Sequence, residues 1–330
     1  MTTDILTIGD TTTDAFIRLK DASTQCDIRH EHCLLCVRFG EKIPYESVTV
    51  VPGVGNSANA AVSCAKLGLS AALRTNMGDD TNGDECIATL EKHGVDTSLV
   101  LREAGKKTNY HYVLWYEADR TILIKHETFT YSFPELPEAP KWIYLSSVGE
   151  GTLPYHQEIA TYLAAHPEVK LAFQPGTFQI KVGKDALKDI YARSDIFFCN
   201  KEESQMILGT QESDEKKLLE GIRALGVKIA VITDGPNGLS AMDADGSAFH
   251  IPMYPDPAPP MQRTGAGDAT ASTTVAFLML GYSLQDSLMR GEINAASVVQ
   301  GVGAQAKLLT REEIETWYTK RPEEFHPTSL

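Results

Sequence analysis

Residues 263–268 read Arg-Thr-Gly-Ala-Gly-Asp and open an apolar helical stretch late in the chain. Small residues let successive backbone N–H groups point at one anion, and the positive end of a helix dipole adds to the attraction. We therefore predict that the amides of Gly265, Ala266 and Gly267 hold a phosphate. Asp268, in the first helical turn, can accept the proton of a hydroxyl that attacks a phosphoryl group. The alternative is an ordinary loop with an acidic residue at a helix N-terminus.

Two polar stretches near the N-terminus are suited to a ligand rich in hydroxyl groups. Residues 9–14 read Gly-Asp-Thr-Thr-Thr-Asp and follow an apolar run, and Asp14 could accept two hydrogen bonds from sugar hydroxyls. Residues 53–61 read Gly-Val-Gly-Asn-Ser-Ala-Asn-Ala-Ala, in which Asn56 and Asn59 offer both donors and acceptors. Glycine loops and asparagine caps occur in many α/β proteins, so each stretch alone is weak evidence.

The elements that position these residues alternate between short β-branched runs and longer helical patterns. Such alternation predicts right-handed crossovers and a mostly parallel sheet covered on both faces by helices. Ligands gather at the carboxyl ends of the strands in sheets of this kind. The expected buried strands are 5–8, 142–145, 171–173, 196–199 and 229–233, and the expected helices include 59–67 and 283–306.

Two segments, 13–51 and 108–130, depart from this alternation. In the second, Tyr110, Tyr112 and Leu114 alternate with other residues at the period of a strand. We expect the two segments to pair into a small sheet at the edge of the main one, where it would form a lid over the active site. The chain is then one domain over residues 1–330, with the lid formed from about 13–51 and 108–130.

The composition is that of an ordinary globular protein, with 330 residues, 42% hydrophobic and 22% charged. The formal net charge of −14 argues against nucleic acid or an anionic membrane as a partner. No window reaches the roughly 18 uninterrupted apolar residues of a membrane span, and the N-terminus has no basic leader. We therefore expect a cytoplasmic protein.

The six cysteines are too sparse for a disulfide scaffold. Cys64, Cys86 and Cys199 lie in apolar surroundings, where buried reduced thiols are expected. A second group could bind zinc through a Cys-x-x-Cys pair, although no second such pair completes the site. The alternative for this group is a β-rich segment with inward-facing thiols. Its members are Cys26, His30, His32, Cys33 and Cys36.

Taken together, these stretches resemble the PfkB or ribokinase family of ATP-dependent carbohydrate and nucleoside kinases. The resemblance covers nearly the whole chain and depends on six elements in the order that the family has. They are Gly-Asp…Asp at 9–14, Gly-x-Gly-Asn-x-x-Asn at 53–59, Gly-Asp-Asp-Thr-Asn-Gly at 78–83, Asn-Lys-Glu-Glu at 200–203, Thr-Asp-Gly-Pro-Asn-Gly at 233–238 and Gly-Ala-Gly-Asp at 265–268. The resemblance implies a ribokinase-like three-layer α/β/α sandwich with a mostly parallel central sheet and a small β-sheet lid.

The resemblance also implies roles for the matching residues. Asp268 is implied to be the catalytic base, and the amides of residues 265–267 are implied to form the anion hole. Asn200 and Glu203 match a motif linked to the placement of phosphate and magnesium, with Glu203 as the candidate metal ligand and contacts that can run through water. A cap at a helix start is the alternative for Glu203.

Other matches fall on the nucleotide and acceptor sides of the family's site. The nucleotide side comprises Thr233, Gly235 and Gly238 of a strand-end loop, and Asn294 on the late helix as an adenine-side candidate. The acceptor side comprises Asp14, Gly55, Asn56 and Asn59. Arg120, on the expected lid, could reach a charged substituent of the acceptor, and a surface arginine beside Asp119 is the alternative.

The chain departs from the family's pattern at three places. Gln262 and Arg263 stand where many members have Asp-Thr, whose carboxylate helps to hold a monovalent cation, so activation by potassium is doubtful. The guanidinium of Arg263 could balance phosphate charge in place of that cation, or it could point to solvent. Residues 54–55 read Val-Gly instead of the usual Gly-Gly, and residues 174–176 read Gln-Pro-Gly where Asp-x-Asn is frequent. The acceptor pocket is therefore expected to be unusual.

We predict a kinase that transfers the γ-phosphoryl group of ATP, as a magnesium complex, to a primary hydroxyl of a sugar or nucleoside. The Walker sequence is absent, which argues against a P-loop mechanism. The alternative is a catalytically silent relative that binds a sugar or nucleotide as a sensor or scaffold, and the intact Asp268 argues against it. The expected partners are these small molecules and a second copy of the chain, as a homodimer through the lid.

Overall fold

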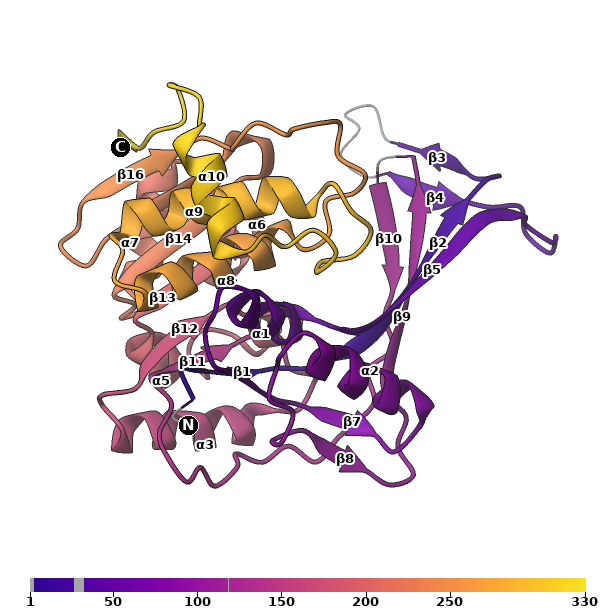
Figure 1. The fold of residues 1–330 in the computed structure, drawn as a ribbon, viewed down its shortest axis with the longest axis horizontal. Helices are drawn as coiled ribbons and strands as arrows, with labels where there is room; N and C mark the ends of the chain where they lie inside the picture. The colour runs from indigo at the N-terminus through magenta and orange to yellow at the C-terminus, as the bar shows by residue number, and fades with distance from the viewer. Residues whose placement is uncertain (1–2, 27–32, 118) are drawn as a thin grey trace.

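Nine strands form one central sheet in the computed structural model, which describes residues 3–26, 33–117 and 119–330 (Figure 1). In chain order they are β1 (Ile5–Ile8), β6 (Ala71–Arg74), β11 (Trp142–Leu145), β12 (Lys170–Phe173), β13 (Ile196–Asn200), β14 (Ile229–Thr233), β15 (Leu239–Met242), β16 (Ala248–Ile251) and β17 (Thr328–Ser329). Their order across the sheet is β17-β16-β15-β14-β13-β12-β11-β1-β6. The strands from β6 to β14 are parallel, and the other three continue the sheet in antiparallel fashion. The five predicted strands are confirmed, with β12 and β13 each one residue longer than expected.

Helices cover both faces of this sheet. One face carries α1 (Asn56–Lys66), α2 (Thr81–Lys92), α8 (Ala266–Met279), α9 (Leu284–Val298) and α10 (Arg311–Thr319). The other carries α3 (Leu153–Ala165), α4 (Thr177–Val182), α5 (Lys188–Arg193), α6 (Lys201–Leu208) and α7 (Glu215–Arg223). Successive strand side chains point to opposite faces, so Ile5 packs in one core and Leu6 in the other. The predicted three-layer α/β/α sandwich is confirmed.

Two helix boundaries differ from the expected ones by more than one residue. Helix α1 begins at Asn56 rather than at 59. The helix expected over 283–306 is wrong in its last part, because α9 ends at Val298. The carbonyl of Val299 accepts from the amide of Met261 instead of continuing the helix, and Gly303 has a φ of 87°, which a right-handed helix does not contain. No helix of the described residues is long and apolar enough to cross a membrane.

A second, four-stranded sheet projects from the main body in Figure 1, and we call it the lid sheet. It consists of β2 (Thr12–Leu19), β5 (Tyr45–Val54), β9 (Asn109–Tyr116) and β10 (Asp119–Leu123) in the order β10-β9-β2-β5. β2 pairs with β5 in antiparallel and with β9 in parallel fashion. The two predicted excursions therefore do pair into a small sheet. That the chain is one domain in which this sheet acts as a lid over the site stays a prediction.

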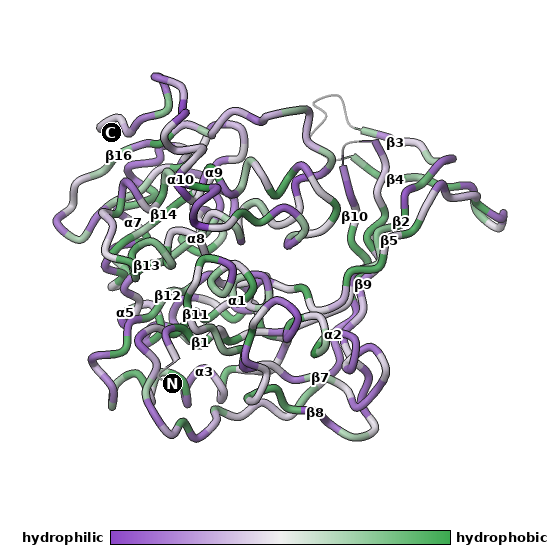
Figure 2. Tube along the Cα trace, in the orientation of Figure 1, coloured by the Kyte–Doolittle hydropathy of each residue, from purple (hydrophilic) through white to green (hydrophobic). Residues whose placement is uncertain are grey.

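The lid sheet has an apolar surface that faces solvent. Hydrophobic and hydrophilic segments alternate along its strands in Figure 2. Val48, Val50 and Tyr112 are each about half exposed, and the register of Ala15 with both Val50 and Tyr112 puts these two residues in one row across the sheet. Such a row is a reasonable contact for a second copy of the chain. The homodimer through the lid stays a prediction.

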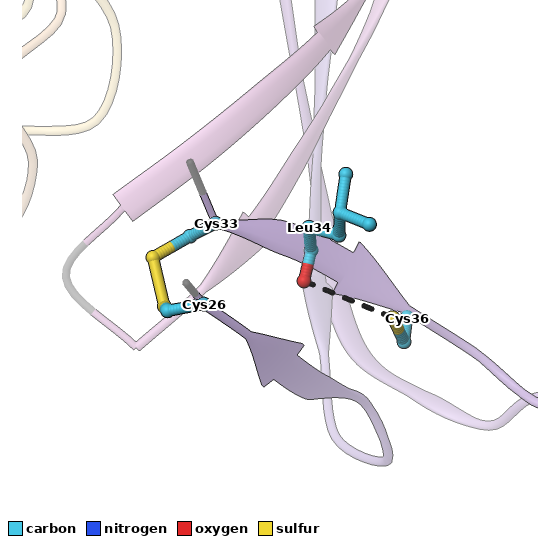
Figure 3. Close-up of a disulfide and its surroundings, with 4 residues drawn as sticks. All are labelled: Cys26, Cys33, Leu34 and Cys36. Atoms are coloured by element: carbon cyan, nitrogen blue, oxygen red, sulfur yellow. Dashed lines mark hydrogen bonds between the residues drawn. A yellow bond between two sulfur atoms is a disulfide. The ribbon is translucent and has the colours of Figure 1, made fainter. Parts of the chain in front are cut away.

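A small hairpin of β3 (Ser23–Gln25) and β4 (Leu34–Cys36) carries the cysteines of the suggested zinc group (Figure 3). Cys26 and Cys33 form a disulfide, so the interpretation as inward-facing free thiols is wrong for these two residues, while the β-rich character is confirmed. Cys36 is a free thiol. His30 and His32 lie outside the described residues, and among the described residues no group of three or more His, Cys, Asp and Glu side chains could hold a metal ion. Cys64, Cys86 and Cys199 are buried and free, as expected.

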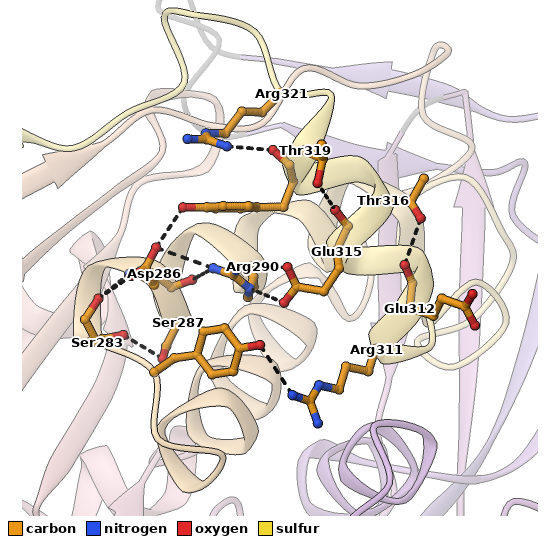
Figure 4. Close-up of polar contacts among 12 residues, drawn as sticks. Ser283, Asp286, Ser287, Arg290, Arg311, Glu312, Glu315, Thr316, Thr319 and Arg321 are labelled. Atoms are coloured by element: carbon orange, nitrogen blue, oxygen red, sulfur yellow. Dashed lines mark hydrogen bonds and ion pairs between the residues drawn. The ribbon is translucent and has the colours of Figure 1, made fainter.

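Helices α9 and α10 are joined by a buried arginine (Figure 4). The guanidinium of Arg290 donates from Nε and Nη2 to the two carboxylate oxygens of Glu315, at 2.8 and 2.9 Å. The same guanidinium lies 3.8 Å from the ring centroid of Tyr318. A bidentate pair packed on an aromatic ring allows little rotation. This contact fixes the position of α9, which lines part of the candidate site.

Candidate active site

The glycine-rich run forms the N-terminus of α8, as predicted. Gly265 is the N-cap residue with a φ of 85°, in the left-handed region that favours glycine. A Cβ atom on Gly265 would also overlap the side chain of Ala304, so no other residue fits there without rearrangement. A Cβ on Gly267 would meet nothing within 4 Å, so its surroundings are open. The first N–H groups of a helix have no partner within the helix, and here they adjoin this open space.

Asp268 accepts hydrogen bonds from three side-chain amides. Nδ2 of Asn59 donates to Oδ2 at 2.7 Å, and Oδ1 accepts from Nδ2 of Asn56 at 2.9 Å and Nε2 of Gln174 at 3.2 Å. Burial raises the pKa of Asp268 above its ordinary value, and the hydrogen bonds from Asn59, Gln174 and Asn56 lower it in part. The carboxylate is therefore held in one orientation and has a higher proton affinity than an exposed aspartate.

Gln174 is a site residue to which the sequence analysis gave no role. It directly follows β12, and its side-chain oxygen accepts a hydrogen bond from the hydroxyl of Tyr144 on β11. Burial, with a further contribution from the charge of Asp268, raises the pKa of the Tyr144 hydroxyl, so this group remains a donor. The donated bond turns the Gln174 oxygen towards Tyr144 and the NH2 group towards Asp268. The only signal in the sequence was the Gln-Pro-Gly that replaces Asp-x-Asn.

Asn59 is oriented in the same way by a glutamine that follows α9. Nε2 of Gln305 donates to Oδ1 of Asn59 at 3.0 Å and to the carbonyl of Gly53 at 2.8 Å. Because the Asn59 oxygen is used by Gln305, its NH2 group faces Asp268. Asn56 and Asn59, predicted on the acceptor side, therefore also position the candidate base. Nothing in the local sequence around Gln305 indicated this contact.

The acceptor side contains two carboxylate and histidine pairs. Oδ1 of Asp14 on β2 lies 3.3 Å from Nδ1 of His111, and Oδ2 of Asp10 lies 3.2 Å from Nδ1 of His126. The two imidazole rings are 5.2 Å apart, and Oη of Tyr131 donates to the other oxygen of Asp10 at 2.8 Å. The structure therefore adds Asp10, His111, His126 and Tyr131 to the predicted Asp14. Asp10 lies in the stretch 9–14 and the two histidines lie in the second lid segment, whereas Tyr131 is one residue beyond that segment and had no signal.

This cluster adjoins the residues that hold Asp268. Gly55 has a φ of 121°, and a Cβ on it would overlap the carbonyl oxygen of Asp10, so the start of α1 lies directly against the cluster. Nε2 of His111 and Nδ2 of Asn109 are buried and have no hydrogen-bond partner among the described residues. Buried polar atoms of this kind need partners, and a ligand with hydroxyl groups can supply them.

On the nucleotide side, the structure brings three of the predicted residues to one cavity of about 180 Å³. Thr233, Gly235 and Gly238 line it from the end of β14 and the short 3₁₀ turn η1 (Gly235–Asn237), and Ala266 and Gly267 line it from α8. Two elements far apart in the sequence thus meet at the glycine-rich N-terminus. The strand-end loop is tethered to α6, because Nζ of the α6 residue Lys201 lies 2.9 Å from the carboxylate of Asp234.

Two of the predicted residues do not reach these places. Asn294 is fully buried, donates to Oγ1 of Thr273 at 2.8 Å, accepts from the amide of Leu309 at 2.8 Å, and is not among the residues that line the cavity. Glu292, on the same helix, does line it. Arg120, on β10, lines a separate cavity of about 370 Å³ beside the β3–β4 hairpin. The structure does not bring Asn294 or Arg120 together with Asp268.

Asn200 and Glu203 form a reciprocal cap at the start of α6. The side chain of Asn200 accepts from the amide of Glu203 at 2.8 Å, and Oε2 of Glu203 accepts from the amide of Asn200 at 2.9 Å. Glu203 therefore does cap the helix start, and it uses one of its two carboxylate oxygens for this. Burial, together with the charges of Asp268 and Glu202, raises the pKa of Glu203, and the hydrogen bond from Asn200 opposes the rise. The charge of Asp268 therefore reaches Glu203.

Gln262 and Arg263, the residues at the first departure from the family's pattern, anchor the chain before α8. Nε2 of Gln262 donates to the carbonyl of Gly301 at 3.0 Å, and Oε1 accepts from the amide of Thr264 at 2.7 Å. Arg263 lines the 180 Å³ cavity and lies 3.5 Å from the carboxylate of Asp256. Whether potassium activates the protein stays a prediction.

Comparison with known proteins decides the family. The chain matches the pfkB family of carbohydrate kinases over residues 5–311. The protein belongs to this family. It is 26% identical over 289 residues to the 5-dehydro-2-deoxygluconokinase of Clostridium tetani, an alignment that covers 82% of this chain and 85% of the relative.

Two solved structures show the fold of this pfkB protein. Arabidopsis thaliana ribokinase, complexed with ribose and ATP, has a TM-score of 0.77 at 18% identity, and the alignment covers 96% of this chain and 98% of that one. A putative ribokinase II from E. coli, in complex with ATP and magnesium, has a TM-score of 0.73 at 18% identity and coverages of 97% and 100%. The protein is therefore a carbohydrate kinase with the ribokinase fold, a phosphotransferase whose acceptor is an alcohol group, as predicted.

Proposed function

We propose that this pfkB kinase transfers the γ-phosphoryl group of ATP to a hydroxyl of a sugar or nucleoside, with Asp268 as the base. The observation that supports this is the position of Asp268. Three amides hold its carboxylate in the first turn of α8, beside the open glycine-rich N-terminus and the 180 Å³ cavity. One location then offers a proton acceptor and donors for a phosphate.

The reaction is a displacement at the γ-phosphorus. The acceptor oxygen forms a bond to phosphorus, the bond to the oxygen that bridges the β- and γ-phosphates breaks, and ADP leaves with that electron pair. Asp268 takes the proton of the acceptor hydroxyl, while the amides of residues 265–267 stabilise the charge on the transferring group. The raised pKa of Asp268 makes its carboxylate a stronger base than an exposed aspartate.

The residues present fit a magnesium ion that is bound chiefly by phosphate and water. Among the described residues no cluster of three protein ligands exists, and Mg²⁺ commonly uses one or two carboxylates and the substrate phosphates. Glu203 would supply that carboxylate, since the cap uses one of its two oxygens and its pKa responds to Asp268. The ion would neutralise phosphate charge. The E. coli neighbour complexed with ATP and magnesium supports magnesium as the ion.

The acceptor would lie against Asp14 and the two histidines. Asp14 offers hydrogen-bond acceptors, and the unpartnered Nδ2 of Asn109 offers a donor. A sugar hydroxyl both donates and accepts, so a pair of hydroxyls can satisfy both groups. The Arabidopsis ribokinase complexed with ribose and ATP supports a pentose or a nucleoside ribose as the first acceptors to test.

The test is phosphotransfer across a panel of sugars and nucleosides, followed by the variant Asp268→Asn on the substrate with the highest rate. Loss of a general base lowers kcat by about 10²- to 10⁴-fold. ATP binding should persist, because the amide cradle is unchanged. The control is Asp189→Asn, an exposed position on α5. Near-normal phosphotransfer by Asp268→Asn would refute the mechanism, and ligand-induced stabilisation without turnover on any substrate would favour the sensor alternative.

A further inference from the structure

The nucleotide side contains a buried carboxylate that the proposed reaction does not use. Glu292, on α9, is 6% exposed and lines the 180 Å³ cavity together with Gly238 and Gly267. Its Oε1 accepts a hydrogen bond from Oγ1 of Thr270 on α8 at 3.1 Å. One carboxylate oxygen is thus bound by the protein, in a side chain that borders the cavity.

The environment of Glu292 is unfavourable for a charge. No ion pair involves Glu292 among residues 3–26, 33–117 and 119–330. Burial raises the pKa of Glu292 to about 7, although the hydrogen bond from Thr270 lowers it in part. An apolar side chain between α8 and α9 would avoid this desolvation. Titratable groups kept in such places gather at functional sites.

The position of Glu292 shows which part of a bound nucleotide it would meet. The proposed phosphate cradle is the first turn of α8, and Thr270 follows Ala266 by four residues, about 6 Å along the helix. A carboxylate repels phosphate, so Glu292 is suited to the part of the ligand beyond the phosphates.

The wall around Glu292 is apolar. Ala295 and Ala296 follow it at intervals of three and four residues, so these three lie on one face of α9. Together with Val299, the C-cap residue of the helix, all three line the cavity. Met253 lines it as well. An apolar wall suits the flat surface of a base, and one polar group on such a wall fixes the orientation of the ligand.

We infer that Glu292 accepts a hydrogen bond from the nucleoside part of the phosphoryl donor, either from an amino group of the base or from a ribose hydroxyl. This inference rests on the proposed function, because it treats the 180 Å³ cavity as the nucleotide site. A contact to the base makes Glu292 select among nucleobases, and a contact to the ribose makes it select against the corresponding deoxynucleotide. The other interpretation is that Glu292 only joins α9 to α8 through Thr270.

The experiment measures nucleotide binding by calorimetry, with magnesium and without an acceptor, so it requires no phosphotransfer. The wild type and Glu292→Met are titrated with ATP and with three analogues: purine riboside triphosphate, which lacks the amino group, 2′-deoxy-ATP and 3′-deoxy-ATP. Glu292→Ala is the second variant, for the case that methionine does not fit between the helices. The control is Glu312→Met, an exposed position on α10.

We expect one analogue to bind the wild type about tenfold more weakly than ATP does, because it lacks one hydrogen bond. Both Glu292 variants should bind ATP about tenfold more weakly and should bind that analogue as they bind ATP. A purely structural role predicts the same ATP-to-analogue ratios in the wild type and in the variants, and that outcome overturns the inference. If the wild type shows no phosphotransfer but its ATP-to-analogue affinity ratio changes in the Glu292 variants, the inference stands and only the proposed function is refuted.

Discussion

Replacing Gln174 by methionine is the most direct test of how the site holds its base. The change keeps the length of the side chain and removes one of three amide donors to Asp268. A hydrogen bond to a charged group contributes about 1.5–3 kcal/mol. The Gln174 bond is the longest of the three at 3.2 Å, so we expect the lower end of this range, a loss of about tenfold in rate.

The pH dependence of the Gln174→Met variant follows from the hydrogen bond that Gln174 donates to Asp268, which lowers the pKa of that carboxyl group. The amide stabilises the charged carboxylate, so its removal raises the pKa of Asp268 further above the ordinary value. The base works only when deprotonated. The acid limb of the kcat profile should therefore move to higher pH, and the loss of rate should be largest at low pH and shrink as pH rises.

The assay is kcat against pH at saturating substrates, for the wild type, Gln174→Met and Tyr144→Phe. Tyr144→Phe removes the hydroxyl that orients the Gln174 amide, so it should shift the acid limb in the same direction by less. Gln157→Met, an exposed change on α3, is the control. An unchanged acid limb with unchanged kcat would show that Gln174 does not act on Asp268. A loss that is equal at every pH would refute the electrostatic part of the reasoning.

Two further changes test the framework of the site. Gly265→Ala should lower the free energy of unfolding, measured in denaturant, by more than Gly246→Ala. Both glycines have a left-handed φ that costs an alanine about 1–2 kcal/mol. Only at position 265 would the new Cβ also overlap Ala304. Equal losses would show that the contact with Ala304 relaxes freely. Arg290→Met should cost about 1–3 kcal/mol, discounted from the value for a fully buried pair because Glu315 is partly exposed. Arg290 lowers the pKa of Glu315 in the folded protein. The pair therefore stabilises the fold above the pKa that Glu315 has in the unfolded chain, and this stabilisation is lost as the pH falls through the folded pKa. Arg290→Met should accordingly lose less stability than the wild type on acidification.

The sheet could be predicted from the sequence because its signal is local. A parallel strand that is buried on both faces is a short, mostly apolar run, and the predicted strands β1 and β11 are buried at every position. β6 is buried at every position as well, but it ends at Arg74 and was not among the five predicted strands. The end of α9 was predicted eight residues too late because the helical pattern continues past Val298. Beyond Val298 the Val299 carbonyl accepts a non-local bond from the Met261 amide, and Gly303 has a left-handed φ of 87°.

The glycine-rich run and Asp268 were also predictable, but the contacts that hold Asp268 were not. Its hydrogen bonds to Gln174, Asn59 and Asn56 join residues that are 94, 209 and 212 positions apart. The resemblance placed the two asparagines at the acceptor side and gave Gln174 no role. Only the packing of α1 against α8, at the end of β12, brings these three amides to one carboxylate.

Helix phase explains the contrast between Asn294 and Glu292. Residues i and i+2 of an α-helix are separated by about 200° around its axis, so Glu292 and Asn294 face nearly opposite directions. Asn294 points into the protein and bonds to Thr273, whereas Glu292 borders the cavity. A sequence match assigns a position to a helix, but which residue faces the cavity depends on how the helix is rotated. Here that rotation is fixed by the pair of Arg290 with Glu315.

Both the whole chain and the candidate site are acidic, although the proposed ligand is an anion. A protein with a net charge of −14 must bind a polyphosphate near three carboxylates, those of Asp268, Glu203 and Glu292. Long-range attraction cannot supply this, because the overall field repels anions. In the proposed mechanism the attraction is local, and we expect it to come from the amides of residues 265–267, the α8 dipole and Arg263 at the cavity wall. A magnesium ion on the nucleotide would reduce the charge that these groups must balance, which explains why so acidic a site can serve a kinase.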